Sequence, residues 1–327
     1  MMAMRSAQFD REIAPAAGVM PTLGRRLLVV HNPAAGARRE RFLQEVVQRL
    51  RDRCCDVELC RTQSLDENLR LVRSAVEGAS CDMVVAAGGD GTVRAVASAV
   101  MGSGMPLGII PIGTGNVMAH EIGLRSNPEA IADCLVDGRI ARVRAAYANG
   151  KPFFLMVGAG FDGRVTGWLD TAAKRRLGKL AYGWPMIRGM IAGPDDLIVR
   201  VDGVEHRAAW AVATLGQHYA GGFMLAPQAH LQAGNIHAVM FKARGRISLL
   251  RQIAGVAAGR VAYQIDIEQV AATTVEITAP EPVPVQIDGE SFGTTPVEIR
   301  TNGPILELVV PRGASAWQLH AESTLSA

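Results

Sequence analysis

A short apolar run that ends in a glycine loop constrains the fold of this chain more than any other stretch. Residues 83–87 are continuously apolar, which predicts a strand buried on both faces of a sheet. The run leads into Gly88-Gly89-Asp90-Gly91-Thr92, and apolar residues from Val93 to Val100 then recur with helical spacing. Because glycine carries no Cβ, a ligand can approach this backbone closely. A strand, a glycine loop and a helix N-terminus in this order indicate a phosphate site.

Asp90 is an unusual residue for a phosphate loop. A carboxylate repels a phosphate group unless it binds a metal ion, holds a hydroxyl group or abstracts a proton. The loop also matches neither the GxGxxG pattern nor the P-loop pattern with its lysine. Spacing by itself therefore leaves two interpretations, a phosphate site or an ordinary tight connection.

The composition indicates an ordered globular protein with room for two domains. The chain has 327 residues, of which 49% are hydrophobic and 20% are charged. A formal net charge of +3 and an aromatic content of 5% argue against a nucleic-acid partner, which would require a dense basic stripe with interleaved aromatic residues. The five cysteines lack the spacing of a zinc site, so we expect free thiols in a reducing cytoplasm.

The first half of the chain alternates predicted strands with predicted helices. Strands are expected at residues 27–31, 56–60, 83–87 and 107–110, and Ser64 with Glu67 has the pattern of a capping box that opens a helix. This alternation predicts a parallel sheet covered by helices. Ligands of such sheets bind beyond the carboxyl ends of the strands, so we expect the loops near residues 32, 88 and 113 to meet at one edge.

The second half is rich in short strands separated by turns, which predicts a mostly antiparallel sandwich or barrel-like domain. Expected strands lie at 153–157, 197–201, 208–214, 236–241, 274–277, 283–287, 297–300 and 306–310, with helices at 165–191 and 247–258. The predicted organisation is a mobile tail (1–21), an α/β domain (22–145), a β-rich domain (146–305) and a C-terminal segment (306–327). No run of 18 apolar residues is present, and residues 1–21 make a poor signal peptide.

Five short strings occur together in this chain. They are Asn32-Pro33 with Gly36, the glycine loop, Pro111 with Gly113-Thr114-Gly115-Asn116, Gly158 and Gly160 with Asp162, and Asp288-Gly289-Glu290. In this order they resemble the bacterial diacylglycerol kinase family of lipid kinases, which includes sphingosine and ceramide kinases and is related to NAD kinases. The resemblance spans residues 27 to about 310. It implies a two-domain fold, ATP in the cleft and a C-terminal segment that packs back on the first domain.

The resemblance assigns nucleotide binding to residues of several loops. They are Asn32, Thr62, Gly88, Gly89, Asp90, Gly91, Thr92, Gly113, Thr114 and Asn116. Backbone N–H groups and hydroxyls can hold phosphates, and Mg²⁺ carried with ATP would neutralise the remaining charge, with Asp90 and Glu290 as its candidate ligands. Family members often carry a separate structural metal site, but residues 231–235 offer no carboxylate here. We therefore expect that structural site to be missing.

The resemblance also implies roles for three acids of the second domain and the glycine loop. Asp288 would act as the general base on a lipid hydroxyl, Glu290 would orient it or hold metal, and Asp90 is the competing base. Asp-Gly is also a common hairpin turn, and Asp202-Gly203 has the same pattern with no chemistry assigned to it. Asp162 matches a position that holds the substrate head group in sphingosine kinases, and a solvated loop acid is the alternative.

A lipid substrate implies a membrane partner. Residues 168–191 combine aromatic and aliphatic residues with Lys174, Arg175, Arg176, Lys179 and Arg188, which suits an anionic membrane surface. An amphipathic helix packed on the second domain is the alternative. We expect a cytoplasmic protein, peripheral at the inner membrane face.

The acceptor could be diacylglycerol, a sphingoid base or ceramide. An NAD kinase-like enzyme and a non-catalytic lipid or nucleotide binder are the alternative functions. The oligomeric state, a homodimer included, stays open.

Overall fold

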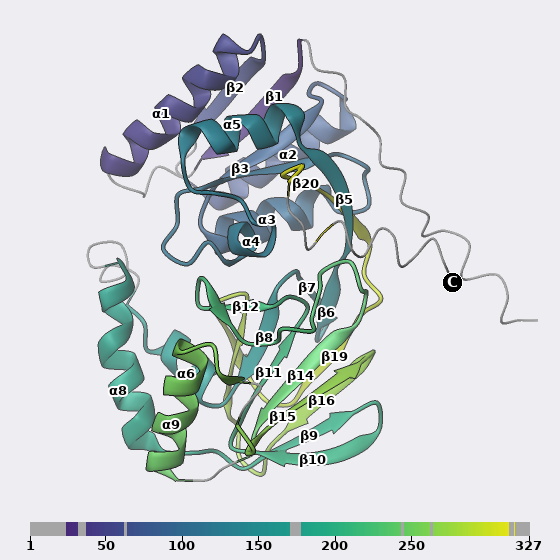
Figure 1. The fold of residues 1–327 in the computed structure, drawn as a ribbon. Helices are drawn as coiled ribbons and strands as arrows, with labels where there is room; N and C mark the ends of the chain where they lie inside the picture. Colours follow the sequence, from purple (N-terminus) through teal and green to yellow (C-terminus); the bar gives the residue numbers. More distant parts are fainter. Residues whose placement is uncertain are drawn as a thin grey trace, which may run out of the picture.

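The glycine loop lies at the end of a central strand, where the carboxyl ends of the strands meet, in the six-stranded sheet of the first of two lobes (Figure 1). The computed structural model describes residues 24–31, 37–61, 64–170, 178–242, 245–261, 264–313 and 317. The strand order is β2-β1-β3-β4-β20-β5, and β5 alone among these strands is antiparallel to its neighbour. The bounds are β1 (Arg26–His31), β2 (Asp56–Arg61), β3 (Met83–Gly88), β4 (Leu107–Pro111), β5 (Arg139–Arg144) and β20 (Ile305–Val310). The predicted parallel sheet is confirmed, except that its edge strand β5 is antiparallel.

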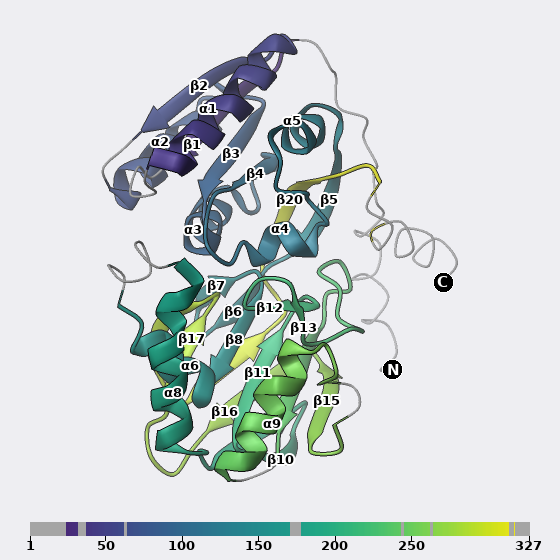
Figure 2. The same ribbon diagram turned by 60° about the vertical axis from the view of Figure 1, so that its left-hand side comes forward.

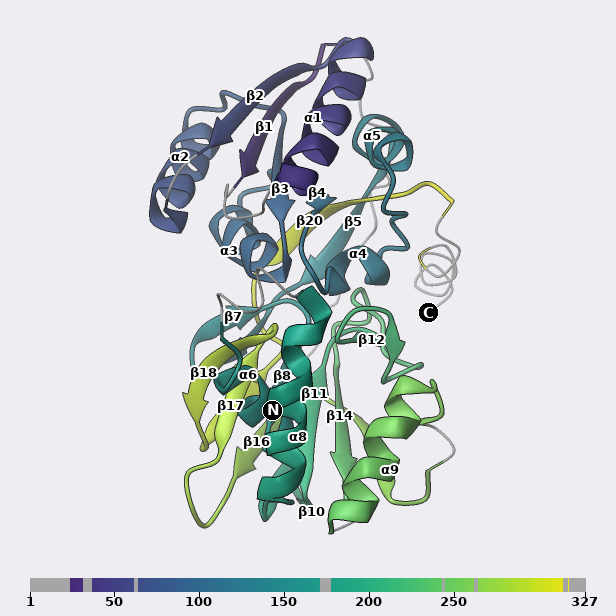
Figure 3. The same ribbon diagram turned by 90° about the vertical axis from the view of Figure 1, so that its left-hand side faces the viewer.

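Helices cover both faces of this sheet, as the alternating pattern predicted. Helices α1 and α5 pack against each other on one face, and α2 and α3 pack against each other on the other (Figure 3). The Ser64 hydroxyl accepts a hydrogen bond from the Glu67 amide at 3.2 Å and caps α2, which confirms the predicted helix start. The bounds are α1 (Ala37–Asp52), α2 (Leu65–Glu77), α3 (Asp90–Val100), α4 (Val117–Glu121) and α5 (Pro128–Asp137).

The second lobe contains two six-stranded antiparallel sheets, as expected for a sandwich. One sheet has the order β10-β9-β16-β19-β6-β7, the other β15-β14-β11-β8-β17-β18, and a short β12–β13 pair lies beside them. The bounds are β6 (Ala146–Ala148), β7 (Lys151–Phe153), β8 (Met156–Ala159), β9 (Leu197–Val201), β10 (Val204–Ala208), β11 (Trp210–Thr214), β12 (His218–Tyr219), β13 (Phe223–Met224), β14 (Ile236–Phe241), β15 (Ile267–Ala272), β16 (Thr274–Thr278), β17 (Pro284–Ile287), β18 (Glu290–Thr294) and β19 (Val297–Arg300).

Helices lie on the outer face of the sheet that contains β8, β11 and β17 (Figure 2). Helix α6 (Phe161–Gly167) packs on these strands, and α8 (Gly183–Ala192) packs on α6. A 3₁₀ helix, η1 (Gly178–Tyr182), precedes α8, and α9 (Arg246–Ala257) lies next to α8. No helix among the described residues has the length and apolar character needed to cross a bilayer.

Three expected elements differ from the structure. The helix expected at 165–191 is divided into α6, η1 and α8, and residues 171–177 lie outside the described residues. The strand expected at 153–157 is divided into β7 and β8, because the Phe154 and Leu155 amides donate to the Asp288 carboxylate and not to a neighbouring strand. The strand expected at 306–310 among those of the second half is β20, which lies in the first sheet between β4 and β5, in agreement with the expectation that the C-terminal segment packs back on the first domain.

The chain crosses between the lobes twice, and the two crossings are hydrogen-bonded to each other. The Ala145 amide donates to the Pro304 carbonyl and the Gly303 amide donates to the Ala145 carbonyl, both at 3.0 Å. A Cβ at Gly303 would overlap the Ala145 carbonyl oxygen, so this close approach requires glycine. The paired crossings fix where the acids of the second lobe meet the loops of the first.

Candidate active site

Two glycine loops of the first lobe pack backbone against backbone. Gly89 precedes the first turn of α3, and a Cβ at Gly113 would overlap Gly89 Cα and lie 2.6 Å from Asn116 Oδ1. Asn116 has a φ of 51° and its Oδ1 accepts from the Gly113 amide at 2.8 Å, so this side chain holds its own loop in shape. The predicted meeting of the loops after β3 and β4 is therefore observed at the α3 N-terminus, where free N–H groups favour an anion.

Asp90 occupies the first turn of α3 and is half-buried beside the second loop. Its Oδ1 accepts a long hydrogen bond from the Met118 amide at 3.4 Å, and a Cβ at Gly115 would lie 2.8 Å from its Oδ2. The carboxylate thus stands between the two glycine loops, where it faces any phosphate bound there.

Asp288 projects from the turn between β17 and β18 of the second lobe. Asp288 and Gly289 have φ values of 48° and 81°. The Asp288 carboxylate is 4% exposed and accepts hydrogen bonds from the amides of Phe154, Leu155 and Met156 at 3.1, 3.0 and 2.9 Å. Burial raises the pKa of Asp288 to about 6, although these amides favour its charged form. The result is a fixed carboxylate poised to exchange a proton near neutral pH.

Asp202 provides an internal comparison with Asp288, because it occupies the same position in the β9–β10 hairpin. Asp202 and Gly203 have φ values of 44° and 87°, but the Asp202 side chain is exposed. Burial raises the pKa of Asp202, and the hydrogen bonds from Thr274 and Thr273 together outweigh that effect and lower it. The two Asp-Gly turns have similar backbones, so burial and the surrounding donors distinguish the acid of the site from the structural one.

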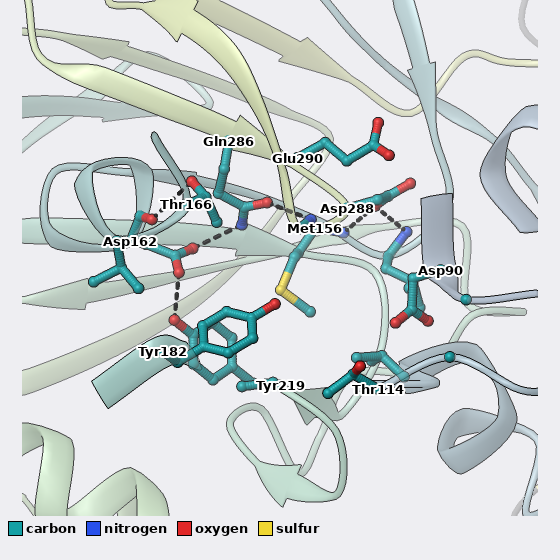
Figure 4. A pocket seen from close by; sticks show the side chains of 18 of the residues that line it. Asp90, Thr114, Met156, Asp162, Thr166, Tyr182, Tyr219, Gln286, Asp288 and Glu290 are labelled. Atoms are coloured by element: carbon teal, nitrogen blue, oxygen red, sulfur yellow. Dashed lines mark hydrogen bonds between the residues drawn. The ribbon is translucent and has the colours of Figure 1, made fainter. Parts of the chain in front are cut away.

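Glu290 links the second lobe to the glycine-loop helix. Its carboxylate forms an ion pair with Arg94 on α3, and any side chain at Gly91 would overlap it. Asp90, Asp288 and Glu290 therefore line one pocket at the junction of the lobes (Figure 4). The carboxylates predicted at positions 90 and 288 face a common crevice, as the site requires.

The pocket has a volume of about 750 Å³ and joins a polar end to an apolar end. The predicted residues that line it are Gly88, Gly89, Asp90, Gly91, Thr92, Gly113, Thr114, Asp162, Asp288 and Glu290. Asn116 lines a small adjoining void instead. Asn32 and Thr62 lie outside the described residues. The apolar end is formed mainly by Leu155, Phe161, Val165, Tyr182, Met186, Trp210, Phe223, Ile253 and Val256.

A buried hydrogen-bond network connects Asp162 to the turn that carries Asp288. The Asp162 carboxylate accepts one hydrogen bond from the Tyr219 hydroxyl and another from Gln286 Nε2 at 2.7 Å. Gln286 Oε1 in turn accepts a hydrogen bond from the Gly289 amide at 2.7 Å. Burial raises the pKa of Asp162, more than these two donors lower it. Asp162 is 5% exposed in α6, so the alternative of a solvated loop acid is wrong.

Among the residues of this site that sequence reasoning missed are Gln286, Arg94 and Tyr219. Gln286 had a usable signal, because it is a polar residue inside an apolar strand, two residues before Asp288. Arg94 follows Asp90 by one helical turn, but nothing in the sequence indicates that it pairs with Glu290. Tyr219 lies in a two-residue strand with no periodic pattern, and only the folded chain brings it to Asp162.

Replacing Gln286 by Leu should lower the free energy of unfolding by about 1–3 kcal/mol, because the buried Asp162 carboxylate loses a donor. Urea unfolding followed by circular dichroism measures this change. Gln48→Leu, at an exposed position on α1, is the matched control and should change stability by less than about 0.5 kcal/mol. Equal unfolding midpoints for Gln286→Leu and the parent chain would contradict the expectation.

The donor set suits a magnesium ion that arrives with a nucleotide. Among the described residues, no group of three or more His, Cys, Asp or Glu could hold a metal by itself. Mg²⁺ is usually bound by one or two carboxylates together with substrate phosphates and water. Asp90, next to the α3 N-terminus, fits that role, whereas Glu290 is already paired with Arg94.

Comparisons with known proteins agree over most of the chain. The model described as the diacylglycerol kinase catalytic domain matches residues 26–148, and that of the YegS C-terminal NAD kinase beta sandwich-like domain matches residues 155–310. A diacylglycerol kinase of Mycobacterium tuberculosis (strain ATCC 25618 / H37Rv) is 30% identical over 279 residues, which cover 81% of this chain and 88% of the relative. A "Probable lipid kinase YegS-like" of Klebsiella pneumoniae (strain 342) is 28% identical over 280 residues, covering 83% and 91%.

Solved structures show the same fold. The crystal structure of a diacylglycerol kinase from Bacillus anthracis str. Sterne superimposes with a TM-score of 0.65 at 19% identity, covering 90% of this chain and all (100%) of that one. A second crystal structure from the same strain gives a TM-score of 0.74 at 24% identity, covering 90% and 98%.

Proposed function

Because the chain belongs to the diacylglycerol kinase family, and is thus an ATP-dependent lipid kinase, we propose that it transfers the γ-phosphoryl group to a hydroxyl of a membrane lipid inside the pocket between its lobes. The observation that carries this proposal is the composition of that pocket. One end has the glycine loops with Asp90, the second lobe contributes Asp288 beside them, and the other end is apolar (Figure 4). A phosphoryl donor and an apolar acceptor can therefore occupy the pocket together.

We assign the phosphates of ATP to the end of the pocket formed by the glycine loops. The N-terminus of the eleven-residue helix α3 offers free N–H groups, and the hydroxyls of Thr92 and Thr114 add further donors. Mg²⁺ would be held by Asp90 and the phosphate oxygens, where it would offset the negative charge of the transferred group. This arrangement explains a carboxylate inside a phosphate loop.

We assign the role of general base to Asp288. Its Oδ1 accepts two of the three backbone hydrogen bonds and its Oδ2 accepts one, so Oδ2 keeps acceptor capacity for a lipid hydroxyl. With a pKa of about 6, the carboxyl group is mostly ionised at neutral pH and can take the hydroxyl proton as the phosphoryl group is attacked. The alternative base, Asp90, is already engaged beside the phosphate site.

The apolar end of the pocket supports a lipid acceptor over NAD. Trp210, Phe161, Val165 and Val256 line it, and these side chains offer little to the polar ribose and amide groups of NAD. Of the basic residues expected to contact a membrane, Lys174, Arg175 and Arg176 lie outside the described residues. A lipid acceptor still requires that the enzyme works at a membrane surface, and we propose the cytoplasmic face of the inner membrane.

The function is tested by incubating the purified protein with labelled ATP, Mg²⁺ and a total lipid extract, followed by identification of the labelled species. We expect one or more phosphorylated lipids, and a parallel reaction with NAD should stay unlabelled. Labelled NADP with unlabelled lipid would favour the NAD kinase-like alternative. Tight ATP binding without transfer to either acceptor would favour a non-catalytic binder.

A further inference from the structure

Exposed apolar side chains gather on the helices that border the apolar end of the pocket. Ten large hydrophobic side chains are exposed among the described residues, and seven of them lie on η1, α8, α9 and β13. They are Leu180 (81% exposed), Trp184 (70%), Ile187 (50%), Ile191 (61%), Phe223 (42%), Ile247 (86%) and Leu250 (52%). We call these seven residues the α8–α9 face. A monomeric protein rarely exposes so many large apolar residues on neighbouring elements without a binding function.

The charge of these helices has one sign. The segments 178–192 and 246–257, which form η1, α8 and α9, contain no aspartate or glutamate, but they contain Lys179, Arg188, Arg246 and Arg251. The Arg188 guanidinium lies over the Trp168 ring at 4.3 Å, and Arg246 donates to the Ile191 carbonyl at 2.9 Å. Arg251 forms an ion pair with Asp266, which lies outside these helices. An apolar face on helices whose charged residues are all cationic is complementary to a surface of acyl chains beneath anionic head groups.

The α8–α9 face is continuous with the interior of the pocket. Tyr182 and Met186 reach the pocket from η1 and α8, and Ile253 and Val256 reach it from α9. Phe223 both lines the pocket and is 42% exposed. Figure 3 shows α8 and α9 together on the same side of the second lobe. Apolar side chains therefore extend from the outside of these helices to the carboxylates of the site.

We propose that the α8–α9 face docks on an anionic lipid bilayer and that the acceptor lipid enters the pocket between α8 and α9. This inference rests on the proposed function, because it assigns the route of the acceptor to the same site. A bilayer fits better than a protein partner, since the face adjoins a pocket whose apolar end needs a ligand that resides in a bilayer. With the face inserted, only the head group and the adjoining part of the lipid need to leave the membrane.

The docking proposal is tested with vesicles made of equal amounts of phosphatidylcholine and phosphatidylglycerol. One variant carries Trp184→Glu and Ile187→Glu on α8, and another carries Ile247→Glu and Leu250→Glu on α9. Each exposed apolar side chain that enters the bilayer contributes roughly tenfold in affinity, so each pair should weaken flotation with vesicles by at least about tenfold. Leu71→Glu, at an exposed apolar position of α2 in the first lobe, is the matched control and should bind like the parent chain.

A second measurement separates docking from chemistry. All variants should phosphorylate a short-chain diacylglycerol, dispersed without a bilayer, at the rate of the parent chain, because none of the four positions lines the pocket. Unchanged vesicle binding in both double variants would overturn the docking proposal. It would also be overturned if the parent chain sedimented as a dimer and the double variants as monomers, with vesicle binding unchanged. If the parent chain phosphorylates neither the short-chain diacylglycerol nor any species of the total lipid extract, the proposed function fails, while the flotation assay still reports on the α8–α9 face.

Discussion

Replacing Asp288 by Asn should lower kcat for lipid phosphorylation by about a hundred- to ten-thousandfold, the range that a positioned general base contributes. Asparagine preserves the shape of the side chain but cannot accept the hydroxyl proton. ATP binds at the other end of the pocket, so its affinity should change by less than about twofold. Single-turnover kinetics with a lipid acceptor and calorimetric titration of ATP measure the two quantities.

The chain offers a matched control for this substitution. Asp202→Asn alters the same residue type in the same kind of turn, on an exposed hairpin outside the pocket, and should leave kcat unchanged. In Asp288→Asn, the side-chain amide presents an N–H group to the Phe154 backbone N–H, where the Asp288 carboxylate accepts a hydrogen bond. This contact is unfavourable, so a stability measurement must show that the variant is folded at the assay temperature. Near-normal turnover by a folded Asp288→Asn enzyme would remove Asp288 from the mechanism.

The raised pKa of Asp288 gives opposite pH dependences for activity and stability. A base must be ionised, so kcat/KM should rise with pH through about 6 and then level off. Stability runs the other way. Burial raises the pKa from 3.8 to about 6, so the native state favours the protonated form, and this contribution is lost as pH rises from about 4 through 6. The whole loss, between about pH 3 and about pH 7, is about 3 kcal/mol, and urea unfolding at these two pH values should show it as a larger decrease in the parent chain than in Asp288→Asn.

Local sequence signals were sufficient for the nucleotide end of the site. The apolar run before Gly88 and the helical spacing after Thr92 specify a strand, a loop and a helix within twenty residues, and parallel order then places the loop at a known sheet edge. The glycines are required because the loops at Gly89 and Gly113 touch through their backbones. The family strings added the expectation that Asp288 faces this edge.

Long-range contacts determined what the sequence did not predict. Phe154 and Leu155 have the composition of a strand, but the carboxylate of Asp288, more than 130 residues away, takes their amides and divides the strand. Leu306 and Leu308 alternate as in any half-buried strand, and although the family resemblance implied a return to the first domain, no local feature indicates that this strand lies between β4 and β5. The pairing of Glu290 with Arg94 likewise depends on two elements from different lobes.

Replacing Asp90 by Asn should lower kcat by at least about a hundredfold and raise the Mg²⁺ concentration needed for half-maximal activity by about tenfold. The variant removes the carboxylate that we assign to the metal, at the start of α3. It also removes a negative charge next to the phosphates, so ATP without Mg²⁺ should bind as tightly or more tightly than to the parent chain. Calorimetric titration of a non-hydrolysable ATP analogue, with and without Mg²⁺, measures this binding apart from turnover.

Glu290→Gln provides the comparison that identifies the metal ligand. The Glu290 carboxylate is paired with Arg94, so its replacement should change the Mg²⁺ dependence less than Asp90→Asn does. Asparagine at position 90 can still accept from the Met118 amide, and loss of the charge near the α3 N-terminus should cost only about 0.3–1 kcal/mol of stability. A wild-type Mg²⁺ dependence in Asp90→Asn, together with a large shift in Glu290→Gln, would assign the metal to Glu290 of the second lobe. Asp90 would then compete with Asp288 for the role of general base.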